Sequence, residues 1–86
     1  MQKLMTLPIV EYLILKNYIY KLLINDRKVT ITSKKKKIFI GKLIGFDEYM
    51  NLVLQNGKFK DINFKEYDFF DYIIIKGHEI TEIFSY

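Results

Sequence analysis

The sequence predicts a small, mainly β domain, in which one N-terminal α-helix precedes five strongly bent antiparallel strands that curve into a small barrel. Three observations favour this fold. The chain has 86 residues, half of them hydrophobic, which suits one domain with its own core. After residue 17, apolar and aromatic runs of strand length recur between turn signals. Glycines interrupt the longest run at Gly41 and Gly45, as expected where a barrel strand bends.

We expect the helix over residues 6–17. Thr6 is suited to the N-cap and Pro8 to the first turn. Apolar residues then recur at helical spacing and predict the buried stripe: Ile9, Val10, Leu13 and Ile14. Because so short a helix is unstable alone, it should cover one end of the sheet.

The five strands are expected at about residues 18–24, 37–46, 50–55, 70–76 and 79–84. The first, YIYKLLI, consists mostly of aromatic and branched residues. A lysine-rich insertion at about residues 26–37 should extend the hairpin that follows it. QNG at Gln55–Gly57 is typical of a turn, and residues 58–71 read as a polar and aromatic connection. The last two strands flank a very tight turn at Lys76–Glu79.

The charge balance suits a polyanionic partner such as nucleic acid. The net charge is +4 and the pI about 9.2, with Arg27 as the only arginine. The chain has no cysteine, which excludes disulfides and thiolate metal sites. The sequence shows no secretory signal, and no apolar run reaches the roughly 20 residues of a membrane span, so we expect no membrane partner.

No group of residues predicts catalysis. Asp47 and Glu48 are adjacent, so on a strand they point to opposite faces and cannot act as a facing acid/base pair. His78 has no cysteine to activate, and Ser33 and Ser85 lack the motif of a nucleophilic serine. The spacing of metal-ligand motifs is also missing. We therefore expect no enzyme, no metal, no cofactor and no small-molecule substrate.

Two lysine-rich segments leave alternatives open. The run of Lys34, Lys35, Lys36 and Lys37 is either a solvated loop or a contact for phosphate groups. The segment Gly57–Tyr72 interleaves lysines with aromatic rings. Such a segment either stacks on bases or packs within strands and subunit contacts.

Two motifs resemble the signatures of the Sm and like-Sm family. In GKLIGFDEYMNLVLQN, a glycine in a bent strand is followed six residues later by an aspartate, then by an aromatic-Met-Asn loop and an apolar strand. The second, IIIKGHEI at Ile73–Ile80, places apolar residues before Lys-Gly. The resemblance extends from about Pro8 to Ile83, and the E-type spliceosomal members are the most similar.

The resemblance implies the Sm fold, an SH3-like small barrel, with residues 1–86 as a single Sm domain. It also implies a seven-membered ring in which the fourth strand of one subunit pairs with the fifth strand of its neighbour. The ring would be a heteroheptamer with F- and G-type neighbours, forming the core of spliceosomal snRNPs. It would bind a U-rich single-stranded site in snRNA for pre-mRNA splicing in the nucleus, with cytoplasmic assembly left open.

The resemblance also implies a role for each motif residue. Tyr49 would stack on a base, and Asn51 would bond its Watson–Crick edge. Lys76 would cover the other face or meet the backbone, Gly77 would let the chain pass close, and Asp47 would brace the loop. His78 completes the RNA-binding set, although the family usually has Asp or Asn there, and Glu79 stands where Asn is common. Met50 should face the core.

Two further hypotheses remain beside the spliceosomal one. A like-Sm ring subunit in U6 snRNA binding or mRNA decay would share the fold and the site but bind a different RNA end. A barrel used only for protein interaction would leave the basic loops without RNA.

Overall fold

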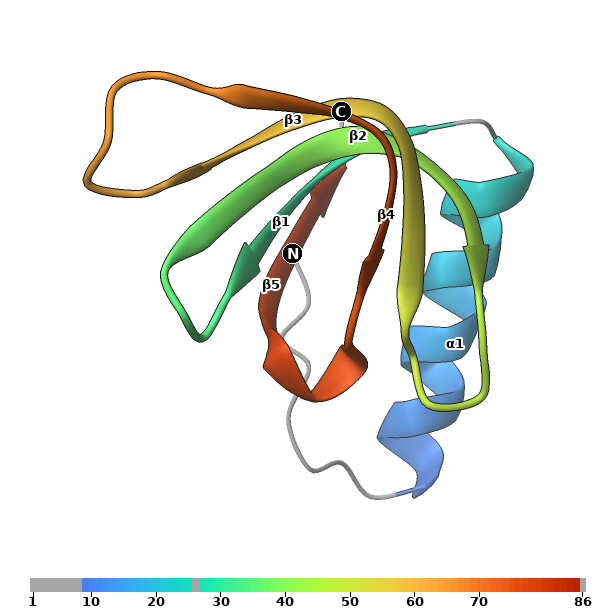
Figure 1. Ribbon diagram of the computed structural model, residues 1–86. Coiled ribbons are helices and arrows are strands. Elements are labelled where there is room, and N and C mark those ends of the chain that lie inside the picture. The colour runs from blue at the N-terminus through green and yellow to red at the C-terminus, as the bar shows by residue number, and fades with distance from the viewer. Residues whose placement is uncertain (1–8, 26, 86) are drawn as a thin grey trace.

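The computed structural model describes residues 9–25 and 27–85, and its architecture is one N-terminal helix followed by five antiparallel strands in a bent sheet (Figure 1). This confirms the expected fold class. The elements are α1 (Ile9–Ile24), β1 (Lys28–Ser33), β2 (Lys37–Phe46), β3 (Leu52–Asp61), β4 (Asp68–Ile75), the 3-10 helix η1 (Gly77–Glu79) and β5 (Ile80–Ser85). The predicted cap Thr6 and first-turn Pro8 lie outside the described residues.

The helix α1 continues through the segment for which we expected a strand, so the strand at residues 18–24 is wrong. Leu15, Ile19 and Leu22 are buried at helical spacing and pack into the core. The expected stripe is wrong at Leu13 and Ile14, which are more than half exposed, while the side chains of Ile9 and Val10 lie outside the described part of the chain. The β-prone composition of YIYKLLI was misleading because packing of one helical face outweighs the weak preference of individual residues.

The first strand lies instead inside the expected lysine-rich insertion at residues 26–37. β1 buries Val29, Ile31 and Ser33 on one face while the residues between them are partly exposed. This alternation is the period of a half-buried strand. The segment is therefore a strand followed by a tight turn, and no long loop extends the hairpin.

The sheet has the order β4-β3-β2-β1-β5 with antiparallel neighbours. The β2–β3 register shifts twice, between Ile40 and Lys42 and between Leu43 and Gly45. Both irregularities fall at the glycines for which we expected bends. There the sheet curves over the core, and α1 packs across one end of it (Figure 1).

The QNG segment is not a turn, because β3 passes through it and ends at Asp61. Asn56 has a left-handed φ of 53° at the first register shift, which asparagine tolerates better than most residues. Gly57 lies so close to the backbone of Ile40 that a side chain would collide with it. The expected connection at residues 58–71 is therefore mostly the outer half of the β3–β4 hairpin, and only residues 62–67 link the two strands.

The core combines the buried face of α1 with residues from every strand. Several of its members are fully buried, among them Ile19, Ile31, Leu43, Leu52, Leu54, Ile80 and Ile83. No helix within the described residues is long and apolar enough to cross a membrane. The core holds two connections in place, the β2–β3 loop through Met50 and η1 through Ile75 and Ile80.

Candidate nucleic-acid interface

The β2–β3 loop is a short hairpin connection with a fixed shape. The Met50 N–H donates to the Asp47 carbonyl at 3.1 Å, and the Asp47 N–H donates to the Asn51 carbonyl at 3.2 Å. Met50 has a left-handed φ of 60° and is buried, as its position in the motif predicts. A left-handed residue after a three-residue turn is common in hairpin loops. The buried Met50 side chain therefore anchors the loop while Tyr49 projects outward.

Asp47 holds the interior of this loop through its carboxylate. Its Oδ1 accepts from the backbone N–H of Tyr49 at 2.9 Å and of Asn51 at 3.0 Å, and its Oδ2 accepts from Asn51 Nδ2 at 2.9 Å. This is the local side-chain-to-backbone bonding by which aspartate shapes turns. The geometry matches the bracing role that the resemblance implied for this residue.

These contacts also set the pKa of Asp47. Desolvation raises the pKa, but the side-chain and backbone hydrogen bonds from Asn51, the backbone bond from Tyr49 and the charge of Lys76 outweigh it. The result is a pKa below the ordinary value of 3.8. The carboxylate is therefore ionised at neutral pH and keeps the Asn51 amide in one orientation.

Gly77 joins the second motif to the first. Its N–H donates to Asn51 Oδ1 at 2.8 Å, although the two residues lie far apart in the sequence. A methyl group at Gly77 would lie within 3.0 Å of backbone atoms of Tyr49 and Met50. Only a residue without a side chain lets η1 pack this closely on the loop, which is why the two motifs form one site.

His78 is not needed for this bracing. The hydrogen bond to Asn51 comes from the backbone of Gly77, so the family's usual Asp or Asn at position 78 can be replaced without losing it. Tyr49, Lys76 and His78 are all exposed, and the Tyr49 side chain has 74% of its surface accessible. The site thus presents an aromatic ring, two further basic or polar side chains and a fixed amide.

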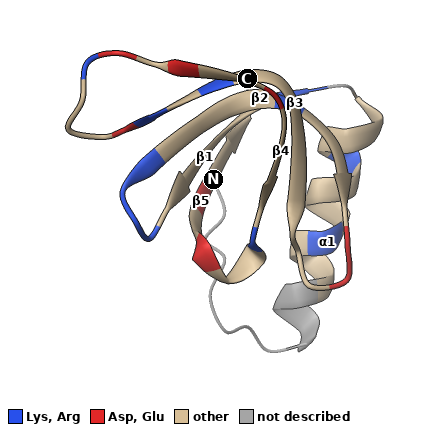
Figure 2. Ribbon diagram, viewed as in Figure 1, with Lys and Arg blue, Asp and Glu red and all other residues tan. Residues whose placement is uncertain are grey.

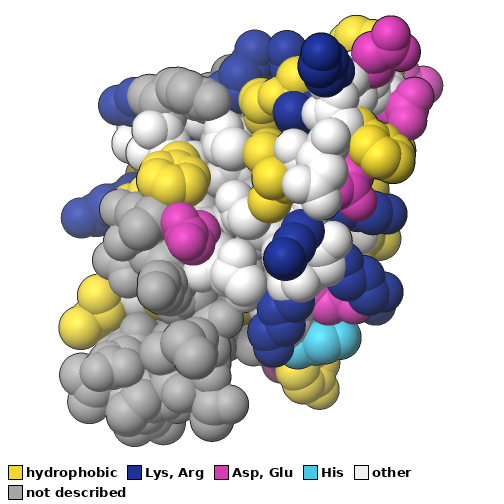
Figure 3. Space-filling view, turned by 90° about the vertical axis from the view of Figure 1, so that its left-hand side faces the viewer, with side chains coloured by type: hydrophobic (Ala, Val, Ile, Leu, Met, Phe, Trp, Pro, Cys, Tyr) yellow, Lys and Arg dark blue, Asp and Glu magenta, His cyan; other side chains and the backbone are white. Residues whose placement is uncertain are grey.

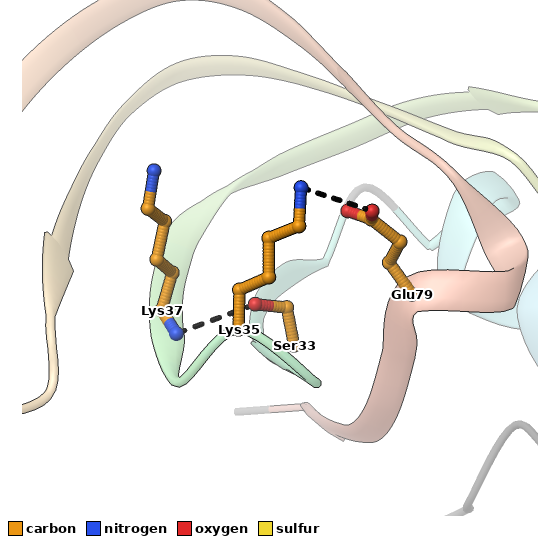
Figure 4. Close-up of polar contacts among 4 residues, drawn as sticks. All are labelled: Ser33, Lys35, Lys37 and Glu79. Carbon is orange, nitrogen blue, oxygen red and sulfur yellow. Dashed lines mark hydrogen bonds and ion pairs between the residues drawn. The ribbon is translucent and has the colours of Figure 1, made fainter.

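The lysine turn, which we define as Lys34–Lys37, connects β1 to β2 and includes the first residue of β2; it lies beside this site. The Lys34 N–H donates to the Glu79 carbonyl at 2.7 Å, and Lys35 Nζ lies 3.4 Å from Glu79 Oε1. Figure 4 shows the side chains of Lys35 and Glu79 pointing toward each other. The charged segments of the turn and of η1 are close in the fold (Figure 2). Sequence reasoning missed this contact because nothing local in either segment indicates it.

Figure 3 shows basic side chains next to the single histidine of the sequence, His78. Within the described residues no cluster of His, Asp and Glu could hold a metal ion. The exposed Tyr49 ring, the Asn51 amide and the basic side chains of this surface offer stacking, hydrogen bonding and attraction of anions.

Part of the lysine-aromatic segment Gly57–Tyr72 packs within its own hairpin, whereas Phe64, Phe69 and Tyr72 are exposed. Phe59 stacks on Phe39 with ring centroids 5.9 Å apart and lies 6.3 Å from Phe70. Lys58 Nζ lies 4.5 Å from the Tyr67 ring centroid. These rings are occupied by neighbours of the same hairpin, which favours the packing alternative for them.

Comparisons with known proteins agree with this fold. A family model described as the LSM domain matches residues 22–84. The chain is 29% identical over 58 residues to the probable small nuclear ribonucleoprotein G of Medicago sativa, covering 67% of this chain and 69% of the relative. Because that relative is G-type, the greater similarity to E-type members is not confirmed.

The solved structures that are similar to this chain include two Sm-type proteins. The Sm protein of Pyrococcus abyssii, solved in complex with a uridine heptamer, shares 28% identity with a TM-score of 0.69, covering 83% of this chain and 96% of that one. The SmAP (LSm) protein of Methanococcus vannielii has 24% identity and a TM-score of 0.63, covering 78% and 87%, and shows the fold alone. Since the family model spans most of the described residues, the chain belongs to the LSM domain family, that of the RNA-binding, non-enzymatic Sm and like-Sm proteins.

Proposed function

We propose that this chain is a subunit of an Sm ring that binds U-rich single-stranded RNA in the core of a spliceosomal snRNP. Tyr49 stacks on a base, Asn51 reads its edge, and Lys76 and His78 flank the nucleotide. Gly77 lets η1 pack closely on the β2–β3 loop, and its N–H donates the hydrogen bond that holds the Asn51 amide.

The observation that carries this proposal is the fixed amide of Asn51. A side-chain amide has two N–H donors and an oxygen with two acceptor positions. Asp47 takes one donor and Gly77 one acceptor position, so one donor and one acceptor remain. Uracil presents the matching acceptor and donor on its Watson–Crick edge, whereas cytosine presents the reverse. Rotating the amide to suit cytosine would place Asn51 Oδ1 against the Asp47 carboxylate. Repulsion between these oxygens opposes the rotation.

Ring assembly is supported by the two edges of the sheet. β4 and β5 each have one neighbour within the described sheet, so each leaves one side without a partner strand there. The β4 edge carries three large, strongly exposed hydrophobic residues, Phe69, Tyr72 and Ile74, and β5 carries Phe84. Open hydrophobic edges promote aggregation unless another strand covers them. Pairing β4 of one subunit with β5 of the next would cover both.

The similar proteins support the same function. The relative from Medicago sativa is named as a small nuclear ribonucleoprotein, and the archaeal Sm protein was solved with a uridine heptamer. We carry both properties to this chain as part of the proposal, together with a nuclear location and a heteroheptameric ring.

The decisive experiment measures RNA binding by the assembled ring. The full-length chain is expressed alone and with F- and G-type Sm subunits, and native mass spectrometry identifies the ring. Binding of U-rich and C-rich single strands is then compared for the wild type, Asn51→Ala and Tyr49→Ala. Loss of a bidentate base contact should reduce discrimination between the bases by about 1–3 kcal/mol, which is roughly five- to 150-fold.

Matched controls separate the site from general effects. Asn63→Ala and Tyr20→Ala remove the same residue types at exposed positions in the β3–β4 connection and on α1. Both should leave U-rich binding unchanged. Equal binding of U-rich and C-rich RNA by the wild-type ring would refute the base-reading assignment.

The subunit type and the kind of ring are tested separately. Assembly with F- and G-type subunits supports the E-type assignment, whereas a stable ring formed by this chain alone contradicts it. Preference for an internal U-rich site supports the snRNP core, and preference for a free 3′ oligouridine end supports a like-Sm ring. A soluble monomer that never assembles would contradict both.

A further inference from the structure

By the base pocket we mean the proposed base-binding surface of Tyr49, Asn51, Lys76 and His78. We propose that the lysine turn is a second contact of this RNA site, where it binds phosphate groups of the strand beyond the base pocket, and that Glu79 limits the strength of that contact by holding Lys35. The inference rests on the proposed function, because it concerns RNA that the base pocket has already bound. It assigns a role to a turn outside both family motifs.

The lysine turn is held beside the base pocket by backbone contacts on two sides. The Lys34 N–H donates to the Glu79 carbonyl at 2.7 Å, and the Ile62 N–H donates to the Lys36 carbonyl at 2.9 Å. Across the intervening 3-10 helix, Gly77 packs on the β2–β3 loop. Three residues of 3-10 helix rise about 6 Å in total, so the turn lies only a short step from the pocket.

The turn itself is a built structure and not an irregular loop. The Lys36 N–H donates to the Ser33 carbonyl at 3.0 Å, and the Lys37 N–H donates to Ser33 Oγ at 3.3 Å. Ser33 is buried, which fixes the base of the turn. Figure 4 shows the Lys37 side chain extending from this turn on the same side as Lys35.

Lys36 occupies a position that favours glycine. Its φ is 60°, in the left-handed region that side chains other than those of Asn and Asp rarely adopt. The chain nevertheless has a lysine there, with an exposed side chain. A left-handed residue is common at the end of a hairpin turn, and at this position it keeps the Lys36 side chain on the surface.

Glu79 forms an ion pair with a lysine of this turn. Its Oε1 lies 3.4 Å from Lys35 Nζ, and 71% of the Lys35 side-chain surface is exposed. Asp61, opposite Lys37 in the sheet, accepts from the Asn63 N–H at 3.1 Å. A phosphate arriving at the turn must therefore compete with Glu79 for Lys35, while the other lysines of the turn add to the attraction.

The RNA backbone is the ligand that this arrangement favours. The turn carries four lysines. The ammonium group of a lysine is a compact charge on a flexible side chain, which binds phosphate groups whatever the base sequence. The turn lies next to a site that presents a stacking ring and a fixed amide, so one single strand can reach both. An acidic protein segment would not need the neighbouring base pocket.

The test uses the assembled ring and a U-rich single strand, with binding measured across a range of salt concentrations. Glu79→Gln should raise affinity about two- to fivefold, the range expected when one exposed ion pair no longer competes. It should also steepen the dependence of log affinity on log salt by about 0.7, the value for one more phosphate on a single strand. Lys35→Gln should lower affinity and flatten that slope.

The double variant Lys35→Gln/Glu79→Gln shows whether Glu79 changes RNA affinity through Lys35. In the Lys35→Gln background, Glu79→Gln should change affinity much less than in the wild type. Glu66→Gln, the same charge change at an exposed position in the β3–β4 connection, should have no effect. The backbone bond from Lys34 to Glu79 does not depend on the Glu79 carboxylate, so thermal unfolding should remain close to the wild type.

Each outcome has one meaning. Unchanged affinity and salt slope in Glu79→Gln, with U-rich binding intact, would overturn this inference and leave the proposed function standing. Failure of the wild-type ring to bind U-rich RNA would overturn the proposed function itself. If Glu79→Gln does not fold, Lys37→Gln decides: a flatter salt slope supports the phosphate contact, and an unchanged slope refutes it.

Discussion

Replacing Gly77 by alanine should separate the two halves of the site. The added methyl group would lie within 3.0 Å of backbone atoms of Tyr49 and Met50, and neither backbone can move without displacing the β2–β3 loop. The hydrogen bond from Gly77 N–H to Asn51 Oδ1, now 2.8 Å long, should lengthen or break. Losing it costs about 1 kcal/mol, and overpacking adds about 1–3 kcal/mol. Together they predict a loss of about 2–4 kcal/mol.

Gly45→Ala is the matched control. A methyl group there meets only Val53 Cγ2 at 4.0 Å, an ordinary contact, so this variant should unfold like the wild type. Thermal unfolding of both variants gives the comparison, because 1 kcal/mol shifts the midpoint of a domain this size by about 4–8 °C. We expect Gly77→Ala to melt at least about 8 °C below Gly45→Ala. Equal midpoints would show that the close approach of Gly77 to the loop does not constrain the site.

Three other predictions concern the loop, the sheet edge and the lysine turn. Asp47 has a lowered pKa in the folded chain, so its stabilising effect is present above pH 3.8 and is lost as the pH falls through the lower folded value. Acid unfolding of Asp47→Asn should therefore depend less on pH in that range, and an unchanged acid transition would contradict the bracing role. Ile74→Asp should abolish the ring in native mass spectrometry while leaving a folded chain by circular dichroism, and an intact ring would count against the β4 edge. Lys36→Gly removes the penalty of a left-handed side-chain-bearing residue, which is about 1–2 kcal/mol. The greater freedom of the unfolded chain offsets about 0.4–1 kcal/mol of that gain. It should raise stability in denaturant by about 0.5–1 kcal/mol while weakening RNA binding, and a lower stability would refute the backbone argument.

Local patterns determined much of this protein in advance. The glycines at positions 41 and 45 mark the two register shifts of β2, and the tight turn before the last strand is η1. Asp47, Tyr49 and Asn51 could be identified as one loop because they lie within a few residues of each other. Such features depend on neighbouring residues, whose spacing and backbone preferences the sequence states directly.

Other features were decided only by tertiary packing. YIYKLLI is helical because Ile19 and Leu22 pack into the core, a contact that outweighs the β preference of its residues. The bond between Gly77 and Asn51 needs the β2–β3 loop and η1 to meet. The lysine turn lies against Glu79 because β1 pairs with β5, which places Ser33 opposite Ile80. Strand order brings these distant residues together, and no local pattern in the sequence encodes that order.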